Sequence, residues 1–142
     1  MSKGLPIIIQ NIVYRKSEEG YEVLMLKRNQ EKGGFWNAVN GTFEYGESIE
    51  ESRKRELFEE TGIGCELKWS DELNRFSFQH GDYVVVVLCY AVEVPAGQAV
   101  VINGEHTEFK WVGFDEAIGM MRFDEDKQGL EVCRDRLAAG EL

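Results

Sequence analysis

The chain has 142 residues, 43% of them hydrophobic, and its 26 acidic and 16 basic side chains give a formal net charge of −10. This length and apolar content suffice for one domain with its own core, so we expect residues 1–142 to form a single domain. The negative charge argues against nucleic acid as a partner, because nucleic-acid backbones bind basic surfaces.

The first part of the chain has the pattern of a β-hairpin. Apolar and β-branched residues at 7–14 and 22–27 flank a polar turn at 16–20, which predicts two antiparallel strands. A loop at 29–34 then leads into the apolar segment 35–39.

Further strands are expected in the second half of the chain, at 65–79, 82–94 and 107–113. The run Val84–Leu88 is continuously apolar. Such a run is typical of a strand that is covered on both faces.

Helical patterns lie between and after these strands. They cover Ser48–Thr61, a short stretch from Asp115 to Met121 with Asp115 as its cap, and a mostly polar stretch Glu125–Ala139. Separated helices and strands of this kind predict an α/β fold in which a mixed sheet lies between helices.

Cysteine usage and apolar run lengths exclude two further classes. Cys65, Cys89 and Cys133 are odd in number and lack C-x2-C spacing, so we expect neither a disulfide framework nor a zinc site but buried or half-buried thiols. No run approaches the roughly 18 to 20 apolar residues of a membrane span. Residues 1–6 lack the apolar stretch of a signal peptide, and we therefore expect a cytoplasmic protein with no membrane partner.

The helix at 48–61 carries acidic side chains on its apolar face. With Glu56 as the zero of a helical wheel of about 100° per residue, Glu59 falls at about −60° and Glu60 at about +40°. Ile49 and Ile63 lie between these angles. The three carboxylates thus share the stripe that an amphipathic helix normally buries.

This arrangement is unfavourable unless a cation is present. Like charges three or four residues apart cost roughly 0.2–0.5 kcal/mol per pair, and Glu59 and Glu60 lie in the last turn, before the expected C-cap Gly62, where the helix dipole favours cations. Arg55, four residues before Glu59, is the nearby positive partner. A solvated acidic face is the alternative interpretation, but the wheel favours carboxylates that hold Mg2+ or Mn2+.

The residues around this helix resemble the Nudix box. Gly41 is followed after five residues by Glu47, and after seven more by R-E-L-F-E-E-T-G-I at 55–63. This matches G-x5-E-x7-R-E-U-x-E-E-x-G-U, with U aliphatic, at every specified position. One departure is Ser52-Arg53, where relatives often have two alanines, so we expect less close packing of the helix there.

The resemblance implies a fold and an activity. The fold is the Nudix α/β/α sandwich with a mixed β-sheet. The activity is that of a Nudix pyrophosphohydrolase, an Mg2+-dependent hydrolase of acid anhydrides in which water cleaves a diphosphate linkage of a nucleotide-like small molecule.

The resemblance also implies roles for individual residues. Three glutamates and one backbone carbonyl form the implied metal-ligand set: Glu56, Glu59, Glu60 and the carbonyl of Asn40. Glu47 would orient this set and Arg55 would hold a glutamate by ion pairing. Gly41 would permit close approach of the backbone to the metal.

The general base is left open among Glu47, Glu60 and Glu105. Glu105 is included because Glu105-His106, followed at an interval by Trp111, resembles several nucleotide-cleaving Nudix enzymes. The alternative is that Glu105 is an exposed loop residue.

Other candidates concern substrate binding. Lys27 and Arg28 end a strand before the box and could bind phosphates, or they could be ordinary surface charges. Phe35 and Trp36 could stack on a base, although aromatic side chains in such a domain more often belong to the core. His106 lacks a metal-ligand partner at useful spacing, so we expect no ligand role for it.

Two substrate classes and one non-catalytic function remain as alternatives. Residues 35–41 resemble nucleoside-triphosphate or dihydroneopterin-triphosphate pyrophosphohydrolases, which we favour, whereas the tail 105–137 resembles diadenosine tetraphosphate hydrolases. Some Nudix-like domains are ligand sensors that have lost the glutamates, but this chain retains them all. The sequence determines neither the base nor whether the protein is a monomer or a homodimer.

Overall fold

The sheet is built on the N-terminal hairpin. In the computed structural model, which describes residues 4–64 and 67–142, β1 (Gly4–Ser17) pairs antiparallel with β2 (Gly20–Arg28). The turn joins Ser17 to Gly20, within the polar segment predicted for it. Both strands extend beyond the apolar runs that predict them, because hydrogen bonding between the strands continues where the side chains no longer face a core.

Six further strands complete the sheet within the described residues: β3 (Trp36–Asn37), β4 (Val39–Glu44), β5 (Lys68–Trp69), β6 (Asn74–His80), β7 (Tyr83–Glu93) and β8 (His106–Gly113). β1 pairs with β2 and β4 along one edge and with β7 along the other, and the β1–β7 pair is parallel while the remaining pairs are antiparallel. The predicted mixed sheet is confirmed.

The strand predicted at 65–79 is two short strands instead of one. Ser70 and Leu73 lie between them and donate backbone hydrogen bonds to the carbonyls of Ala91 and Cys89, so β7 keeps its partner although the strand is interrupted. Residues 65–66, and with them Cys65, lie outside the described part of the chain.

Three α-helices lie in the described part of the chain: α1 (Ile49–Thr61), α2 (Phe114–Met120) and α3 (Asp124–Ala138). A short 3-10 helix, η1 (Gln30–Lys32), lies in the loop after β2. Among residues 4–64 and 67–142, no helix is long and apolar enough to span a membrane.

The ends of α1 follow from its capping residues. Ser48 and Glu51 form a capping box, since each side chain accepts a hydrogen bond from the backbone N–H of the other. Gly62 ends the helix in the left-handed conformation, with φ of 74°, as predicted. The cap predicted for α2 is wrong: Gly113 occupies the N-cap without a side-chain hydrogen bond, and Asp115 lies in the first turn, where a negative charge is also favoured.

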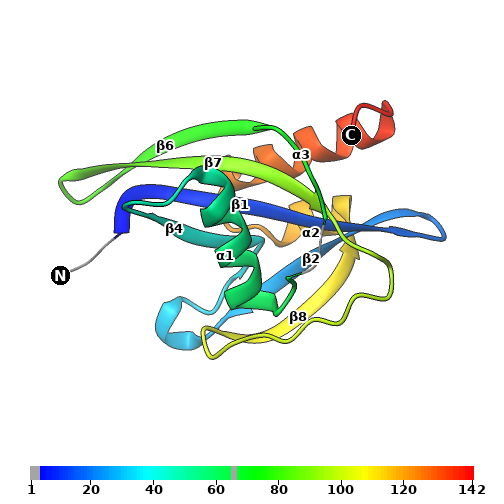
Figure 1. Cartoon of the computed structure of the whole chain (residues 1–142), viewed down its shortest axis with the longest axis horizontal. Coiled ribbons are helices and arrows are strands. Elements are labelled where there is room, and N and C mark those ends of the chain that lie inside the picture. Colours follow the sequence, from blue (N-terminus) through cyan, green and yellow to red (C-terminus); the bar gives the residue numbers. More distant parts are fainter. Residues whose placement is uncertain (1–3, 65–66) are drawn as a thin grey trace.

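The sheet separates two groups of buried side chains, with α1 on one face and α2 and α3 on the other (Figure 1). Successive residues of β1 point to opposite faces, so Ile12 packs toward α3 and Val13 packs toward α1. Cys89 and Cys133 are free thiols buried on the α3 side. This arrangement is the α/β/α sandwich expected from the sequence.

The run Val84–Leu88 is covered along only part of its length. Val87 and Leu88 are buried, but Val84 is 63% exposed. The tip of the β6–β7 hairpin extends past the helices on both faces of the sheet (Figure 1). The prediction of a strand covered throughout is therefore wrong at its first residues.

At Ser52-Arg53, where relatives often have two alanines, the Arg53 side chain places a buried cation against the sheet. The guanidinium carbon of Arg53 lies 4.1 Å from the centroid of the Tyr90 ring and 4.6 Å from that of Trp69. Its nitrogens donate to the backbone carbonyls of Ser70 and Ala91 at 2.9 and 3.3 Å. Burial lowers the pKa of Arg53 to about 10, so the side chain remains charged near neutral pH and the aromatic faces stabilise it.

Close packing of α3 on the sheet gives a test of the fold. A Cβ at Gly129 would overlap the sulfur of Cys89 and lie 3.0 Å from Oε1 of Gln10. Although alanine normally stabilises a helix relative to glycine, we expect Gly129→Ala to lower the free energy of unfolding by about 1–3 kcal/mol because the core is overpacked. Urea denaturation measures this change.

The control is Gly119→Ala in α2, where no described atom lies within 4 Å of the added Cβ. This change should raise the free energy of unfolding by up to about 1 kcal/mol. In the double variant with Cys89→Ala, the total loss should be smaller than the sum of the single losses. Equal stabilisation by both glycine replacements would contradict the packing described for α3.

Candidate active site

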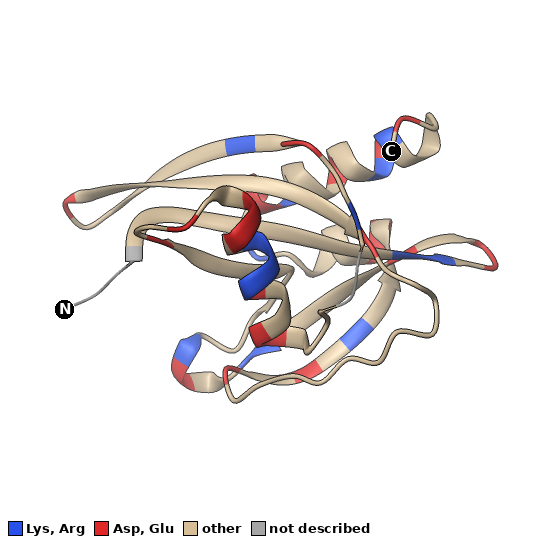
Figure 2. Cartoon of the chain, in the orientation of Figure 1, with Lys and Arg blue, Asp and Glu red and all other residues tan. Residues whose placement is uncertain are grey.

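A cleft of about 470 Å3 lies between the C-terminal half of α1, β4, the end of β2 with η1, and the start of β8 with the residue before it. Its lining residues are Ile8, Arg28, Lys32, Asn37, Ala38, Asn40, Gly41, Thr42, Glu44, Arg55, Glu56, Glu59, Glu60, Glu105 and His106. Figure 2 marks charged positions on α1 and around η1, which supply both glutamates and basic residues to this lining. The cleft thus combines carboxylates and cations.

Glu60 is the most deeply buried carboxylate of the cleft. It is 4% exposed, and its Oε2 has no hydrogen-bond partner within the described residues. Burial, followed by the nearby charges of Glu56 and Glu105, raises the pKa of Glu60 to about 9. The site therefore disfavours an isolated negative charge at Glu60 and favours one that is paired with a cation.

Glu56 occupies a space left by a glycine. It is 7% exposed, and burial raises its pKa to about 7 against the opposing effect of Arg55. A Cβ at Gly41 would overlap the Glu56 carboxyl group. Gly41 is therefore needed for close approach between β4 and this carboxylate, whereas the approach of the backbone to a metal, which the resemblance implied, stays a prediction.

Glu59 differs from its two neighbours because its side chain is 52% exposed. The buried arc of α1 includes Arg53 and Leu57, which fall at about +60° and +100° on the wheel. The buried face is thus rotated away from Glu59, which lies at the rim of the cleft and contacts Nη1 of Arg55 at 3.1 Å. The expectation that all three carboxylates share the buried stripe of the helix is wrong for Glu59.

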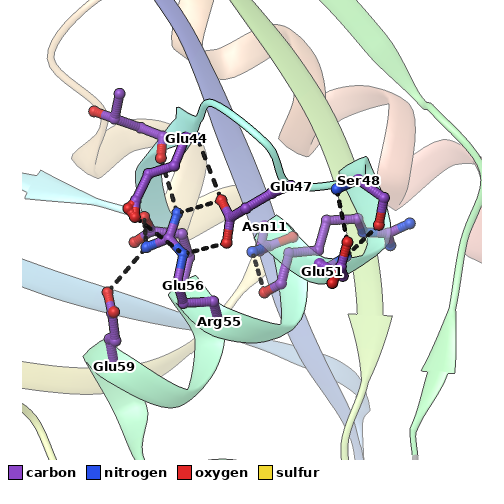
Figure 3. A network of polar contacts seen from close by, with 10 residues as sticks. Asn11, Glu44, Glu47, Ser48, Glu51, Arg55, Glu56 and Glu59 are labelled. Atoms are coloured by element: carbon purple, nitrogen blue, oxygen red, sulfur yellow. Dashed lines mark hydrogen bonds and ion pairs between the residues drawn. The ribbon is translucent and has the colours of Figure 1, made fainter. Parts of the chain in front are cut away.

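Arg55 connects the carboxylates of the site (Figure 3). Its Nε and Nη2 donate to the two oxygens of Glu47 at 2.6 and 2.9 Å, and its Nη1 donates to Glu56 at 2.7 Å as well as to Glu59. Nη2 also donates to the carbonyl of Thr42 at 3.0 Å. The hydrogen bond with Glu47 raises the pKa of Arg55 above its usual range and lowers the pKa of Glu47.

Glu47 itself does not line the cleft. Both of its oxygens are bound by Arg55, and Oε1 also accepts the backbone N–H of Glu44 at 3.2 Å. Glu47 is therefore connected to the cleft indirectly, through the guanidinium of Arg55.

Oxygen ligands for a hard divalent cation are available at the buried end of the cleft. Oε2 of Glu60 and Oδ1 of Asn40 are buried and have no hydrogen-bond partner among residues 4–64 and 67–142, and Gly41 leaves room for the Glu56 carboxylate. Mg2+ and Mn2+ bind such oxygens. Among the described residues, however, no three acidic, histidine or cysteine side chains are gathered tightly enough to hold one ion as they stand. Arg55 pairs with Oε1 of Glu56 and Oε2 of Glu59 here, so these two oxygens are already engaged by a positive charge.

The opposite side of the cleft is basic. Arg28 and Lys32 line it together with His106, whose pKa burial lowers. Nε of Arg28 is buried without a partner in the described part of the chain. Lys27 does not line the cleft, since alternation along β2 points it away from Arg28, and its Nζ lies 3.5 Å from Glu108.

Glu105 reaches the site from the loop before β8. Its Oε1 lies 3.3 Å from Nζ of Lys32, and its charge contributes to the raised pKa values of Glu56 and Glu60. The structure thus brings Glu105 to the cleft together with the α1 glutamates.

The two aromatic candidates lie outside the cleft lining. The Phe35 ring centroid is 5.5 and 5.4 Å from the guanidinium carbons of Arg28 and Arg122. Trp36 packs against the hydrophobic group on the α3 side, and Nζ of Lys110 lies 5.1 Å from the centroid of its ring.

Sequence reasoning missed Lys32, Glu44 and Thr42, which line the cleft from loops and a strand edge. Helical periodicity cannot locate such residues. The pairing between the η1 loop and the loop before β8, which brings Lys32 to Glu105, has no sequence signal, whereas Glu44 lies close to Glu47 in the sequence.

The chain is similar to known proteins in sequence and in fold. The family model described as the NUDIX domain matches residues 8–133. The chain is 36% identical over 121 residues to an octanoyltransferase from Myxococcus xanthus, a match that covers 82% of this chain and 32% of that protein. The chain therefore spans about a third of the length of that relative.

Two solved structures share the fold. A C. elegans Ap4A hydrolase, solved as a binary complex, has a TM-score of 0.84 and 21% identity, with 94% of this chain and 98% of that chain covered. The E. coli dihydroneopterin triphosphate pyrophosphohydrolase has a TM-score of 0.79 and 23% identity, with 92% and 96% covered. At these identities the likeness concerns the fold alone.

The space at Gly41 gives a test of the site. In Gly41→Ala the added methyl group displaces the Glu56 carboxylate, which is the far end of a flexible side chain. We therefore expect little change in the melting temperature but a fall in Mn2+ affinity of about 10- to 100-fold, the range found when support for a metal ligand is removed. Mn2+ titration followed by electron paramagnetic resonance measures this affinity.

The matched control is Gly97→Ala, where no described atom lies within 4 Å of the added Cβ. It should leave Mn2+ affinity unchanged. Unaltered affinity in Gly41→Ala would mean that Glu56 does not bind the ion from the position described.

Proposed function

Because the chain belongs to the Nudix family, we propose that it is an Mg2+- or Mn2+-dependent pyrophosphohydrolase that cleaves a diphosphate linkage in a nucleotide-like substrate. Family membership supports hydrolysis of such linkages in general. The substrate and the metal requirement of this chain belong to the proposal.

One observation carries the proposal. Glu60 is almost fully buried at the cleft, has an oxygen without a partner among the described residues, and lies near two further carboxylates, Glu56 and Glu105. Such a cluster is costly when it is ionised and unpaired. A divalent cation would compensate this negative charge. Phosphate groups bound to the same cation would lie next to the basic side of the cleft, which carries Arg28 and Lys32.

The residues on the basic side of the cleft and the glutamates on the opposite side have different proposed roles. Arg28 and Lys32 would bind phosphate oxygens, because their charges lie on the cleft opposite the glutamates. Glu56, Glu59, Glu60 and the carbonyl of Asn40 would hold the cation. Bound there, the ion would neutralise charge on the diphosphate and lower the pKa of the attacking water.

Arg55, which lines the cleft, and Glu47, which lies outside the lining, would position the cluster. The guanidinium contacts Glu56 and Glu59 directly, and Glu47 holds that guanidinium through two hydrogen bonds. This arrangement supports a role for Glu47 in orienting Arg55. It makes Glu47 a weaker candidate for the general base, since both of its oxygens are engaged.

The proton of the attacking water would pass to a glutamate that reaches the cleft. Glu60 and Glu105 both do so. If Glu60 binds the cation, its oxygens are occupied, and we propose Glu105 as the residue that positions the water or accepts its proton.

For the substrate, we favour a nucleoside triphosphate or a similar triphosphate over a dinucleoside polyphosphate. The support is the resemblance of residues 35–41 to triphosphate pyrophosphohydrolases. Proteins that act on either class share this fold, so a panel containing both classes of compound is the direct test.

The decisive experiment combines metal dependence with two glutamine variants. Glu60→Gln removes the charge while keeping the shape, so we expect kcat to fall by about a hundredfold or more while the protein stays folded. Glu50→Gln should retain nearly full activity, because Glu50 is exposed and paired with Lys54. Release of phosphate or pyrophosphate with Mg2+, with Mn2+ and with excess EDTA is the measurement.

Full activity in excess EDTA would contradict the metal requirement. Equal losses in the two variants would contradict the assignment of Glu60 to the cleft. Mg2+ or Mn2+ should also raise the melting temperature of the unaltered protein, because the ion binds the folded state.

A further prediction concerns Glu105. We expect Glu105→Ala to lower kcat about ten- to a thousandfold, in the range of a lost proton transfer or lost metal contact. Glu108→Ala is the neighbouring control, since Glu108 is exposed and contacts Lys27 outside the cleft. Near-full kcat in Glu105→Ala at saturating Mg2+ would show that the reaction does not use Glu105.

A further inference from the structure

The segment between β7 and β8 crosses the C-terminal end of α1. The backbone N–H of Val101 donates to the carbonyl of Thr61 at 2.9 Å, and Val100 and Ile102 pack against the hydrophobic group beneath α1. This segment therefore contacts the end of the helix that carries Glu59 and Glu60 and continues directly into Glu105.

Asn103 joins the two parts of the cleft through opposite ends of one side chain. Its Nδ2 donates to the carbonyl of Glu59 at 3.0 Å, and its Oδ1 accepts the backbone N–H of Glu105 at 3.0 Å. A planar amide sets the direction of both hydrogen bonds at once. The two hydrogen bonds therefore link the backbone of Glu105 to the last turn of α1.

The carbonyl of Glu59 needs such an external partner. It is one of the last carbonyls of α1, which lack donors within the helix. The next available backbone donor, the N–H of Ile63, is directed to Oγ1 of Thr61 at 3.3 Å. Asn103 thus supplies a hydrogen bond that the helix itself does not provide.

The other side of Glu105 is held by Asn29. The backbone N–H of Asn29 donates to the carbonyl of Glu105, and its Nδ2 donates to the carbonyl of Gly104, both at 2.9 Å. The backbone of Glu105 is therefore fixed on one side to the η1 loop and on the other side to α1.

We propose that Asn103 is a positioning residue, which sets the separation between Glu105 and the glutamates at the end of α1 and acts on the reaction only through Glu105. This inference rests on the proposed function, because it takes Glu105 to act in the cleft. A residue that only caps the helix would contribute to stability independently of the Glu105 carboxylate.

A double-mutant cycle separates these two roles. We expect Asn103→Ala to lower kcat about 10- to 100-fold, the range for loss of a group that orients a functional side chain. In the Glu105→Ala background the same change should lower kcat less than about twofold, because the group that it positions is gone. If the kcat losses of the two single variants multiply in the double variant, the proposal is overturned.

A second variant tests both ends of the amide. Asn103→Asp keeps an acceptor for the N–H of Glu105 but loses the donor to Glu59, so it should lose kcat as Asn103→Ala does. Wild-type kcat in Asn103→Asp would overturn the proposal, since the tie to α1 would then be dispensable. Asn74→Ala is the control, because Asn74 makes an exposed side-chain hydrogen bond to Gln128 outside the cleft.

Mn2+ affinity gives a readout besides turnover and separates this inference from the proposed function. The same cycle, measured by electron paramagnetic resonance, should show weaker Mn2+ binding in Asn103→Ala and no further weakening in the Glu105→Ala background. If the unaltered protein binds Mn2+ but hydrolyses no compound of the panel, the proposed function fails while the affinity cycle still decides the role of Asn103. Losses explained by a lowered melting temperature alone, and recovered at lower temperature, would also overturn it.

Discussion

The arrangement of the cleft depends on the guanidinium of Arg55. Four carboxylate-bearing residues lie within 4 Å of it, at the end of β4, in the following loop and on α1: Glu44, Glu47, Glu56 and Glu59. An arginine can do this because its donors point in several fixed directions in one plane. Without it, the β4–α1 connection would bring together negative charges that repel one another.

Arg55 nevertheless leaves Glu60 uncompensated. The guanidinium contacts the glutamates toward the start and the exposed side of the helix, whereas Glu60 lies on the buried side, where it meets Glu56 and Glu105. The charge of the site is thus balanced unevenly, with ion pairs at the rim and an unpaired carboxylate inside. This unevenness leaves the inner end of the cleft with a buried carboxylate, whose charge burial and the neighbouring Glu56 and Glu105 disfavour.

The sequence predicts the parts of this site that depend on local periodicity. Burial of Glu56 and Glu60 follows from the helical wheel, and the helix end follows from Gly62. Exposure of Glu59 does not follow, because the orientation of α1 is decided by its contacts with the sheet, where Arg53 packs on Tyr90 and Trp69. A local pattern contains no information about that rotation.

Residues supplied by loops are still harder to predict. Lys32 and Asn103 enter the site through pairing between segments far apart in the sequence, and nothing near either residue marks it. The uncovered start of β7 has a similar cause, since an apolar run reveals a strand but not where the neighbouring helices end. For Glu105, it was the likeness to a family rather than periodicity that singled the residue out.

The parallel pairing of β1 with β7 has a consequence for how the chain reaches its fold. Ile7 lies opposite Val86, and β2 takes β8 as its neighbour, so the central strand cannot acquire its second partner until most of the chain has been synthesised. Contacts between such distant segments slow folding, because a large loop must close first. α1 is therefore synthesised before the segment around Val101 and Asn103 that contacts its C-terminal end, so the hydrogen bonds between the two form only after that segment is available.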